Sequence, residues 1–235
     1  MQILSIFQKR SKLDATIRQT AQARKSEGSV ADSLFKGAYQ GFAEVMLDDS
    51  LRADTLYHWG FALLHQAKTK SDSEAEKLYL DAIKKFEFCM LINPSYLGAA
   101  INGGVAYMDL ARLKQVAPAD ELYELALTQF ETANAIHKGT ASYNLACIYA
   151  LRNEQEACLN ALEFSRDHGS LPDTDEILHD PDMTNVLEQD WFINFIDNLP
   201  KKAVPVAKTT TAPTEEPAAT EGVSETTETA SDESV

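Results

Sequence analysis

The chain has 235 residues, of which 44% are hydrophobic, and its formal net charge at neutral pH is −15. This length and hydrophobic fraction are typical of a globular protein that can bury a core. The strong negative charge argues against nucleic acid as a partner, because proteins that bind phosphate backbones usually present a basic surface.

The cysteines and the N-terminus indicate the cellular compartment. Cys89, Cys147 and Cys158 form no CxxC pair and fall inside predicted helices, two of them at positions where a repeat favours a small apolar residue, which indicates packing in a reducing environment. The apolar start MQILSIF is too short for a signal sequence or a membrane span. We therefore expect a cytoplasmic protein.

The first fifty residues predict two helices. The apolar start is followed by Lys9, Arg10 and Lys12, so residues 1–12 are a candidate membrane contact, the alternative being a terminal turn packed on the rest of the chain. Helix formers dominate residues 11–25, and the Gly-Ser pair at 28–29 predicts a stop followed by a second helix over residues 30–47.

A helical pattern recurs along the chain. A small residue, a phenylalanine four positions later and a small or β-branched residue three positions further occur at an interval of 44 residues, as Ala38-Phe42-Val45, Ala82-Phe86-Cys89 and Ala126-Phe130-Ala133. Small residues let a neighbouring helix approach, while the phenylalanine fills the space between them. Pro94 ends the middle copy. This spacing is typical of the second helix of a tetratricopeptide (TPR) repeat.

The corresponding first helices are also recognisable. Residues 52–68 place Leu56, Trp59, Gly60 and Leu63 at the TPR spacing, and similar positions follow around residues 100–107 and 145–149. About ten extra residues separate the two helices of the middle repeats, so either the helices or their loops are longer than the TPR minimum. Pro118 and Asp120 predict a break between two helices.

The predicted fold is all-α: a right-handed TPR-like solenoid of about four helix pairs. We divide the chain into an N-terminal segment (1–11), helical repeats (12–170), two short amphipathic capping helices (171–200) and a disordered acidic tail (201–235). The tail is assigned from its composition, because almost no large apolar residue occurs in it.

The segments HWGFALL, DAIKKFEFCMLINP, INGGVAY and YNLACIYAL resemble those of TPR proteins, and the resemblance covers roughly residues 12–200. Within that superfamily, the WG-x-ALL opening, the inter-helix insertion and the A-I-x-K-F-E run resemble the plant-type receptor subunit of the mitochondrial outer-membrane translocase. That resemblance implies binding of amphipathic presequence helices. The run YNLACIYALRNEQEACLNALE also resembles bacterial TPR proteins of unassigned role, and we favour this broader interpretation.

The first helices of such repeats line a concave groove, and the positions after each packing stripe should face it. These positions are Tyr57, Phe61, His65, Ile101, Val105, Met108, Tyr143 and Cys147. They are largely apolar, which suits a docked peptide. The alternative is that this stripe belongs to the core, because the superhelix is tight or the chain's own termini fill the groove.

Two amides occupy equivalent places in successive repeats. Asn102 and Asn144 should face the groove, with His58 one repeat earlier, and could hold a peptide backbone through its N–H and C=O groups. The alternative is that these asparagines bridge neighbouring helices. The groove lacks the lysines and arginines of a chaperone carboxylate clamp, so we argue against that function.

No pattern of residues predicts catalysis, a metal or a cofactor. The sequence contains no HExxH, nucleophile elbow or phosphate loop, and the carboxylates of DTDE and DPD lack the glycine and terminal glutamate of an EF-hand. We interpret them as helix caps. The predicted function is a non-enzymatic adaptor or scaffold that binds a peptide of a partner protein, the alternative being a membrane-associated targeting or assembly factor resembling an import receptor.

Overall fold

The computed structural model describes residues 2–200, with side chains from residue 7 onward. The acidic tail predicted for residues 201–235 lies outside the described residues. Within residues 2–200 the chain contains helices and no strand, as the all-α prediction required. The longer helices are α1 (Gln2–Ala23), α2 (Gly28–Val45), α3 (Arg52–Ala67), α4 (Asp72–Ile92), α5 (Leu97–Lys114), α6 (Glu121–Ile136), α7 (Ser142–Leu151) and α8 (Gln155–Asp167).

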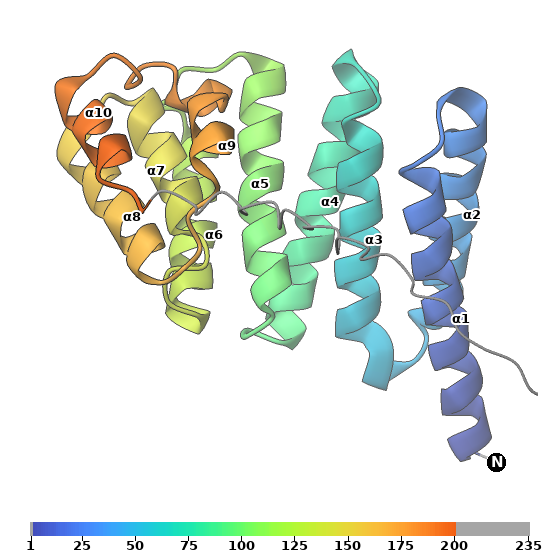
Figure 1. Cartoon of the computed structure of the whole chain (residues 1–235). Coiled ribbons are helices and arrows are strands. Elements are labelled where there is room, and N and C mark those ends of the chain that lie inside the picture. The colour runs from blue at the N-terminus through green and yellow to red at the C-terminus, as the bar shows by residue number, and fades with distance from the viewer. Residues whose placement is uncertain (1, 201–235) are drawn as a thin grey trace, which may run out of the picture. The chain divides into compact units, whose positions relative to one another are not determined.

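Each of these helices packs on the next one along the chain, so that α1 to α8 form a row in Figure 1. After α8 the chain forms three short elements, α9 (Thr174–Leu178), the 3₁₀ turn η2 (Pro181–Met183) and α10 (Asp190–Asp197). We call residues 171–199 the closing segment. It ends the row, next to α7 and α8, where a cap was predicted.

The recurring phenylalanines are packing residues. Phe42, Phe86 and Phe130 are fully buried. A Cβ on Gly60 would lie 2.8 Å from the Phe86 ring, and one on Gly104 would lie 2.5 Å from the Phe130 ring. Any side chain at either glycine would therefore displace the ring, which explains why small and large residues alternate in this pattern.

The extra residues between α3 and α4 lengthen these helices and not the loop between them. Only four residues separate the end of α3 at Ala67 from the start of α4 at Asp72. The break predicted at residues 118–120 is confirmed, since Pro118 lies between α5 and α6 and the Asp120 side chain accepts a hydrogen bond from the Leu122 N–H at the start of α6.

The helix α1 begins earlier than the sequence pattern indicates. It starts at Gln2, so the boundary that we placed after residue 11 falls inside a helix. Its cations also have partners: Lys9 lies 3.5 Å from Asp48, Arg10 lies 2.9 Å from Asp54, and Lys12 pairs with Glu44. These three cations are therefore directed at α2, α3 and the connection between them.

Two clusters of buried side chains form the core. One joins α1 and α2 and includes Leu51 and Ala62, and the other extends from α3 to α10. Tyr39 and Trp59 contact both clusters, with their rings 6.4 Å apart. The helices α1 and α2 are thus attached to the rest of the row through aromatic contacts as well as through the ion pairs of α1.

Candidate functional site

A cavity of about 160 Å³ lies between α1 and α3. Three of the residues that the sequence predicts to face a groove, Tyr57, His58 and Phe61, line it from α3. The remaining walls come from α1, the turn that follows it and α2: Ile17, Thr20, Ala21, Arg24 and Phe42. We call this the α1–α3 cavity. Its lining is largely aliphatic and aromatic, which is the usual composition of a site for an apolar group.

Tyr57 connects the cavity to the next pair of helices. Its ring centroid lies 4.9 Å from that of Tyr96 and 6.2 Å from that of Phe61. A Cβ on Gly98 would meet the Tyr57 ring at 2.8 Å, so α5 approaches α3 closely at this point. Burial raises the pKa of the Tyr57 hydroxyl, which keeps this group neutral and able to donate a hydrogen bond.

Two histidines on α3 are kept neutral by their surroundings. The His65 ring lies 4.4 Å from the Phe61 ring, and burial, followed by the nearby cations Arg24 and Lys68, lowers the pKa of His65 to about 4. Burial likewise lowers the pKa of His58. At neutral pH both imidazoles are uncharged, so they add ring surface and hydrogen-bonding nitrogens to this face without adding charge.

The two asparagines differ from each other. The Asn102 amide donates to the Gly98 carbonyl at 2.9 Å and to the Tyr57 hydroxyl at 3.4 Å, so it bridges α5 and α3. Asn144 on α7 is partly buried, and its side chain has no hydrogen-bond partner within residues 7–200. Ile101 and Val105 on α5 are also partly buried and pack against the core.

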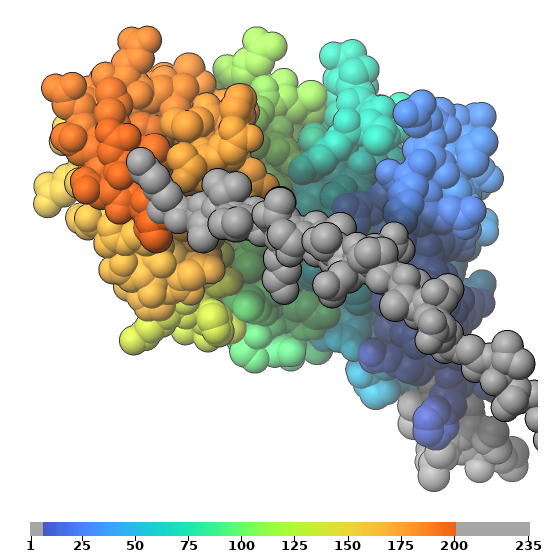
Figure 2. All heavy atoms as spheres, in the orientation of Figure 1, coloured from blue at the N-terminus to red at the C-terminus, as the bar shows by residue number. Residues whose placement is uncertain are grey.

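The closing segment covers the α7 end of the predicted groove. Met108 and Cys147 are only 3% and 4% exposed. The Tyr143 hydroxyl donates to the Asp180 carboxylate at 2.9 Å, which brings the start of η2 onto α7. In Figure 2 the orange atoms of this segment lie beside the green atoms of α5, and η2 contacts α7. The predicted stripe is therefore accessible near α1 and α3 and covered near α7.

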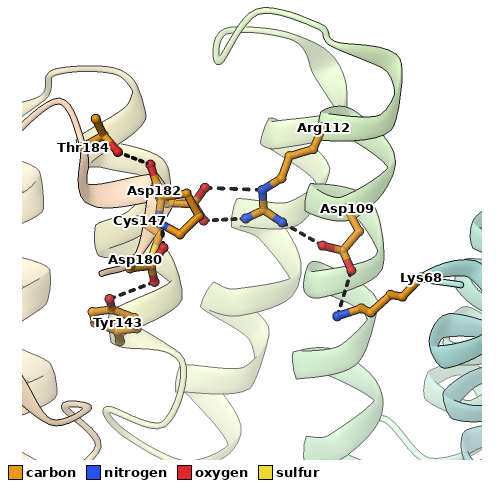
Figure 3. Close-up of polar contacts among 9 residues, drawn as sticks. Lys68, Asp109, Arg112, Tyr143, Cys147, Asp180, Asp182 and Thr184 are labelled. Carbon is orange, nitrogen blue, oxygen red and sulfur yellow. Dashed lines mark hydrogen bonds and ion pairs between the residues drawn. The ribbon is translucent and has the colours of Figure 1, made fainter. Parts of the chain in front are cut away.

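An ionic network fixes this cover in place (Figure 3). The Arg112 guanidinium on α5 donates to both carboxylate oxygens of buried Asp182, and its third nitrogen donates to Asp109 at 2.7 Å. Lys68, the C-cap residue of α3, lies 3.1 Å from the other oxygen of Asp109. Four side chains thus link α3, α5 and the closing segment, and a bidentate arginine–carboxylate pair at the centre fixes their orientation.

The sequence pattern identified neither Arg112 nor the contact partners of the DPD motif. The Asp180 carboxylate accepts from the Asp182 N–H, so the interpretation of Asp180 as a cap is confirmed. Its second contact, with Tyr143, and the pairing of Asp182 with Arg112 depend on distant parts of the chain. The only sequence signal for them is the acidic character of residues 171–199, which contain eight acids and no lysine or arginine.

Three of these side chains lie close enough together to hold a metal ion. The candidate ligand atoms of Cys147, Asp180 and Asp182 lie within 4.8 Å of one another. However, Arg112 already balances the charge of Asp182, and burial, reinforced by Asp180 and Asp182, raises the pKa of the Cys147 thiol well above its ordinary value. Both oxygens of Asp182 already accept hydrogen bonds from Arg112, so the geometry favours the ionic network over a metal site.

Residues 33–155 match a family model described as the plant-specific mitochondrial import receptor subunit TOM20. No curated protein and no solved structure matches the chain significantly. The match contains α3 to α7, whereas the whole of α1 and the whole closing segment lie outside it. Among the residues that the structure describes, no helix combines the length and the apolar character that crossing a bilayer requires.

The family match corrects one prediction and supports another. The cytoplasmic localisation expected from the sequence is wrong, because the family is that of a mitochondrial receptor. The local resemblance to the plant-type import receptor is confirmed at the level of the family, which is one of receptors and not of enzymes. The match spans just over half of the chain's 235 residues, so the chain belongs to the plant-specific mitochondrial import receptor subunit TOM20 family.

Proposed function

We propose that this protein is a non-enzymatic receptor that binds an apolar segment of a partner protein on the face formed by α1, α3 and α5. The observation that carries the proposal is the α1–α3 cavity, in which predicted groove residues from α3 meet apolar residues from α1 and α2. A partner of this kind is consistent with a family of import receptors, whose ligands are proteins. A right-handed TPR-type solenoid would place α1, α3, α5 and α7 on one concave face.

The binding surface would be shorter than the sequence pattern suggests. Tyr57, His58, Phe61 and His65 on α3 form its centre, and Ile101, Asn102 and Val105 on α5 extend it. Met108 and Cys147 are buried and would contribute only by shaping the floor. Tyr143 is held by Asp180 of the closing segment, and Asn144 would mark the far limit of the accessible surface.

The proposal is tested by measuring peptide binding. A fluorescently labelled amphipathic helical peptide is titrated with the full chain, and its anisotropy gives the dissociation constant. Phe61→Ala should weaken binding roughly tenfold, because it removes one aromatic wall of the cavity. Phe88→Ala is the matched control, since Phe88 is 55% exposed on α4 and does not line the cavity. Equal effects of the two substitutions would refute the proposed site.

The alternative, a targeting or assembly factor that contacts a membrane through residues 1–12, makes a different prediction. Phe7 is 71% exposed near the start of α1 and would be the natural insertion point. The neighbouring Lys9, Arg10 and Lys12 are occupied by carboxylates, which weakens any attraction to anionic lipid. Flotation with anionic vesicles that wild type shows and Phe7→Glu loses would favour this alternative.

A further inference from the structure

One side of α4 is both exposed and apolar. Four large apolar side chains of this helix are exposed, whereas each of the other helices has at most one among the side chains that the structure describes. We call these four residues the α4 stripe: Leu80, Phe88, Leu91 and Ile92. At helical spacing they share one side of α4, and the opposite side packs against α3 and α5 (Figure 1).

The next copy of the repeat indicates that the α4 stripe is not needed for packing. Three of the four equivalent positions, 44 residues later on α6, hold small or polar residues: Glu124, Thr132 and Ala135. The buried sides of the two helices are nevertheless alike, since Phe86 and Phe130 are both almost fully buried. An exposed apolar surface that the fold does not require indicates a binding site for another molecule.

Exposed positive charge accompanies the stripe. Lys77 and Lys84 are exposed on the same side of α4, and among the described residues no carboxylate pairs with either of them. Lys85 is directed at an aromatic ring of α3. The nearby acids are less available, because Asp81 is partly buried and Glu87 accepts a hydrogen bond from α5. The surface therefore offers apolar contacts together with two cations that lack partners.

We propose that the α4 stripe is a second interaction surface, which binds an acidic amphipathic helix of a partner protein. Large apolar side chains of that helix contact Phe88, Leu91 and Ile92, and its carboxylates pair with Lys77 and Lys84. From Lys77 to Ile92 the helix rises about 22 Å, so a partner helix of about four turns fits along it. None of these residues lines the α1–α3 cavity, so this proposal does not depend on the proposed receptor site.

Other occupants match the surface less well. Residues 201–235 are rich in acids but contain no leucine, isoleucine, methionine or aromatic residue that could cover the stripe. A second copy of the chain would present the same unpaired lysines. A membrane would have to bury the charge of Lys84, which lies between Leu80 and Phe88 in the middle of the stripe, whereas a carboxylate on a partner helix neutralises it.

The test uses two labelled helical peptides with the same apolar residues, one with glutamates and one with lysines beside them. Each is titrated with the full chain, and its anisotropy gives the dissociation constant. The glutamate peptide should bind roughly threefold to tenfold more tightly at low salt, and the difference should shrink as salt is added.

Two substitutions introduce the residues that α6 holds at the equivalent positions. Phe88→Thr, after Thr132, should weaken binding of the glutamate peptide roughly tenfold. Lys84→Thr, after Thr128, should remove most of the preference for glutamate over lysine. Phe164→Thr is the matched control, because Phe164 is an exposed phenylalanine on α8. Equal melting temperatures of wild type and these variants are expected, since all three side chains are exposed.

Several results would overturn the proposal. A lysine peptide that binds as tightly as the glutamate peptide contradicts the charge preference, and equal effects of Phe88→Thr and Phe164→Thr contradict the location. If Phe61→Ala weakens binding of the glutamate peptide and Phe88→Thr does not, the peptide occupies the α1–α3 cavity instead. Sedimentation and vesicle flotation test the other occupants: self-association or membrane binding that wild type shows and Phe88→Thr loses would assign the stripe to a second copy or to lipid.

Discussion

The two ends of the predicted groove are equivalent stretches of sequence with opposite surroundings. Near α1 and α3, Tyr57, His58 and Phe61 surround an accessible cavity. Near α7, Tyr143 and Cys147 lie beneath the closing segment, which is held by carboxylates. An apolar residue at the same repeat position is thus a candidate contact at one end and part of the core at the other.

The two ends of the predicted groove differ because different elements pack against them. The closing segment buries Ile177, Met183 and Phe192 completely, so it supplies its own apolar surface to α7 and α8. The helix α1 instead offers a narrow stripe, in which Ile17 and Ala21 alternate with polar residues, and leaves a cavity between itself and α3. A solenoid needs a covered end, and here the closing segment also covers the α7 end of the predicted groove.

The largest expected effect is the loss of a buried ring at the covered end. Phe192→Ala should lower the free energy of unfolding by about 3–5 kcal/mol, because Phe192 is fully buried against the core. Phe61→Ala should cost less than about 1.5 kcal/mol, because its ring is partly exposed. Urea denaturation followed by circular dichroism measures both. Similar losses of unfolding free energy for the two variants would mean that Phe61 is a core residue in the same way as Phe192.

The next prediction breaks the ionic cover. Arg112→Met should destabilise the fold by about 2–3 kcal/mol at neutral pH, because it leaves the Asp182 charge buried without a partner. The second substitution in Arg112→Met/Asp182→Asn should restore most of the loss, which unfolding measurements on the single and double variants can establish. No recovery in the double variant would show that Arg112 acts through its aliphatic packing alone.

The same variant has a pH dependence with a definite sign. Burial raises the pKa of Asp182 above its ordinary value of 3.8 despite Arg112, and removing Arg112 would raise it further. The folded protein then binds a proton at higher pH than the unfolded chain does, so protonation favours folding. The loss caused by Arg112→Met should therefore shrink as pH falls from 7 toward 4. If the stability loss caused by Arg112→Met stays constant between pH 7 and pH 4, the loss does not come from an unpaired Asp182 charge.

At the cavity end, acid should lower the stability of the wild-type protein, whereas at the covered end it should reduce the loss caused by Arg112→Met. Because the pKa of His65 in the folded protein is about 4 and its ordinary value is 6.5, the unfolded chain takes up the proton first as pH falls. The stability contributed by neutral His65 is present above pH 6.5 and is lost toward pH 4, by roughly 1–2 kcal/mol after allowance for its partial exposure. NMR titration of His65 measures the pKa directly, and Arg24→Gln should raise it. A titration near 6.5 in wild type would contradict the effect of burial on this histidine.

The smallest effects concern the two asparagines. Asn102→Ala should cost about 0.5–1.5 kcal/mol of stability, because it removes the bridge between α5 and Tyr57. Asn144→Ala should change stability by less than about 0.5 kcal/mol, since its side chain has no partner within residues 7–200. The proposed function requires that the double variant bind the peptide more weakly. Thermal melts of the two single variants measure this difference in stability. Equal melting temperatures would show that Asn102 is no more important for the fold than Asn144.

The sequence was most informative where contacts are local or periodic. The spacing of Phe42, Phe86 and Phe130 predicts their burial, and Pro118 with Asp120 predicts the start of a helix. Its limits show at the termini. The sequence pattern predicts a helix from residue 11, whereas α1 begins at Gln2. The ion pairs of Lys9, Arg10 and Lys12 with distant acids, which hold this beginning as a helix, leave no periodic signal in the sequence.

The sequence by itself determined the all-helical character and the residues at which helices pack, because small and aromatic side chains at helical spacing can be buried in only one way. The tertiary structure alone decided which part of the apolar stripe remains accessible. That outcome depends on Arg112 meeting Asp182 and on Tyr143 meeting Asp180, pairs separated by 70 and 37 positions in the chain. Repeat spacing carries no information about such pairs, since it describes each helix and its neighbours and not what folds over them.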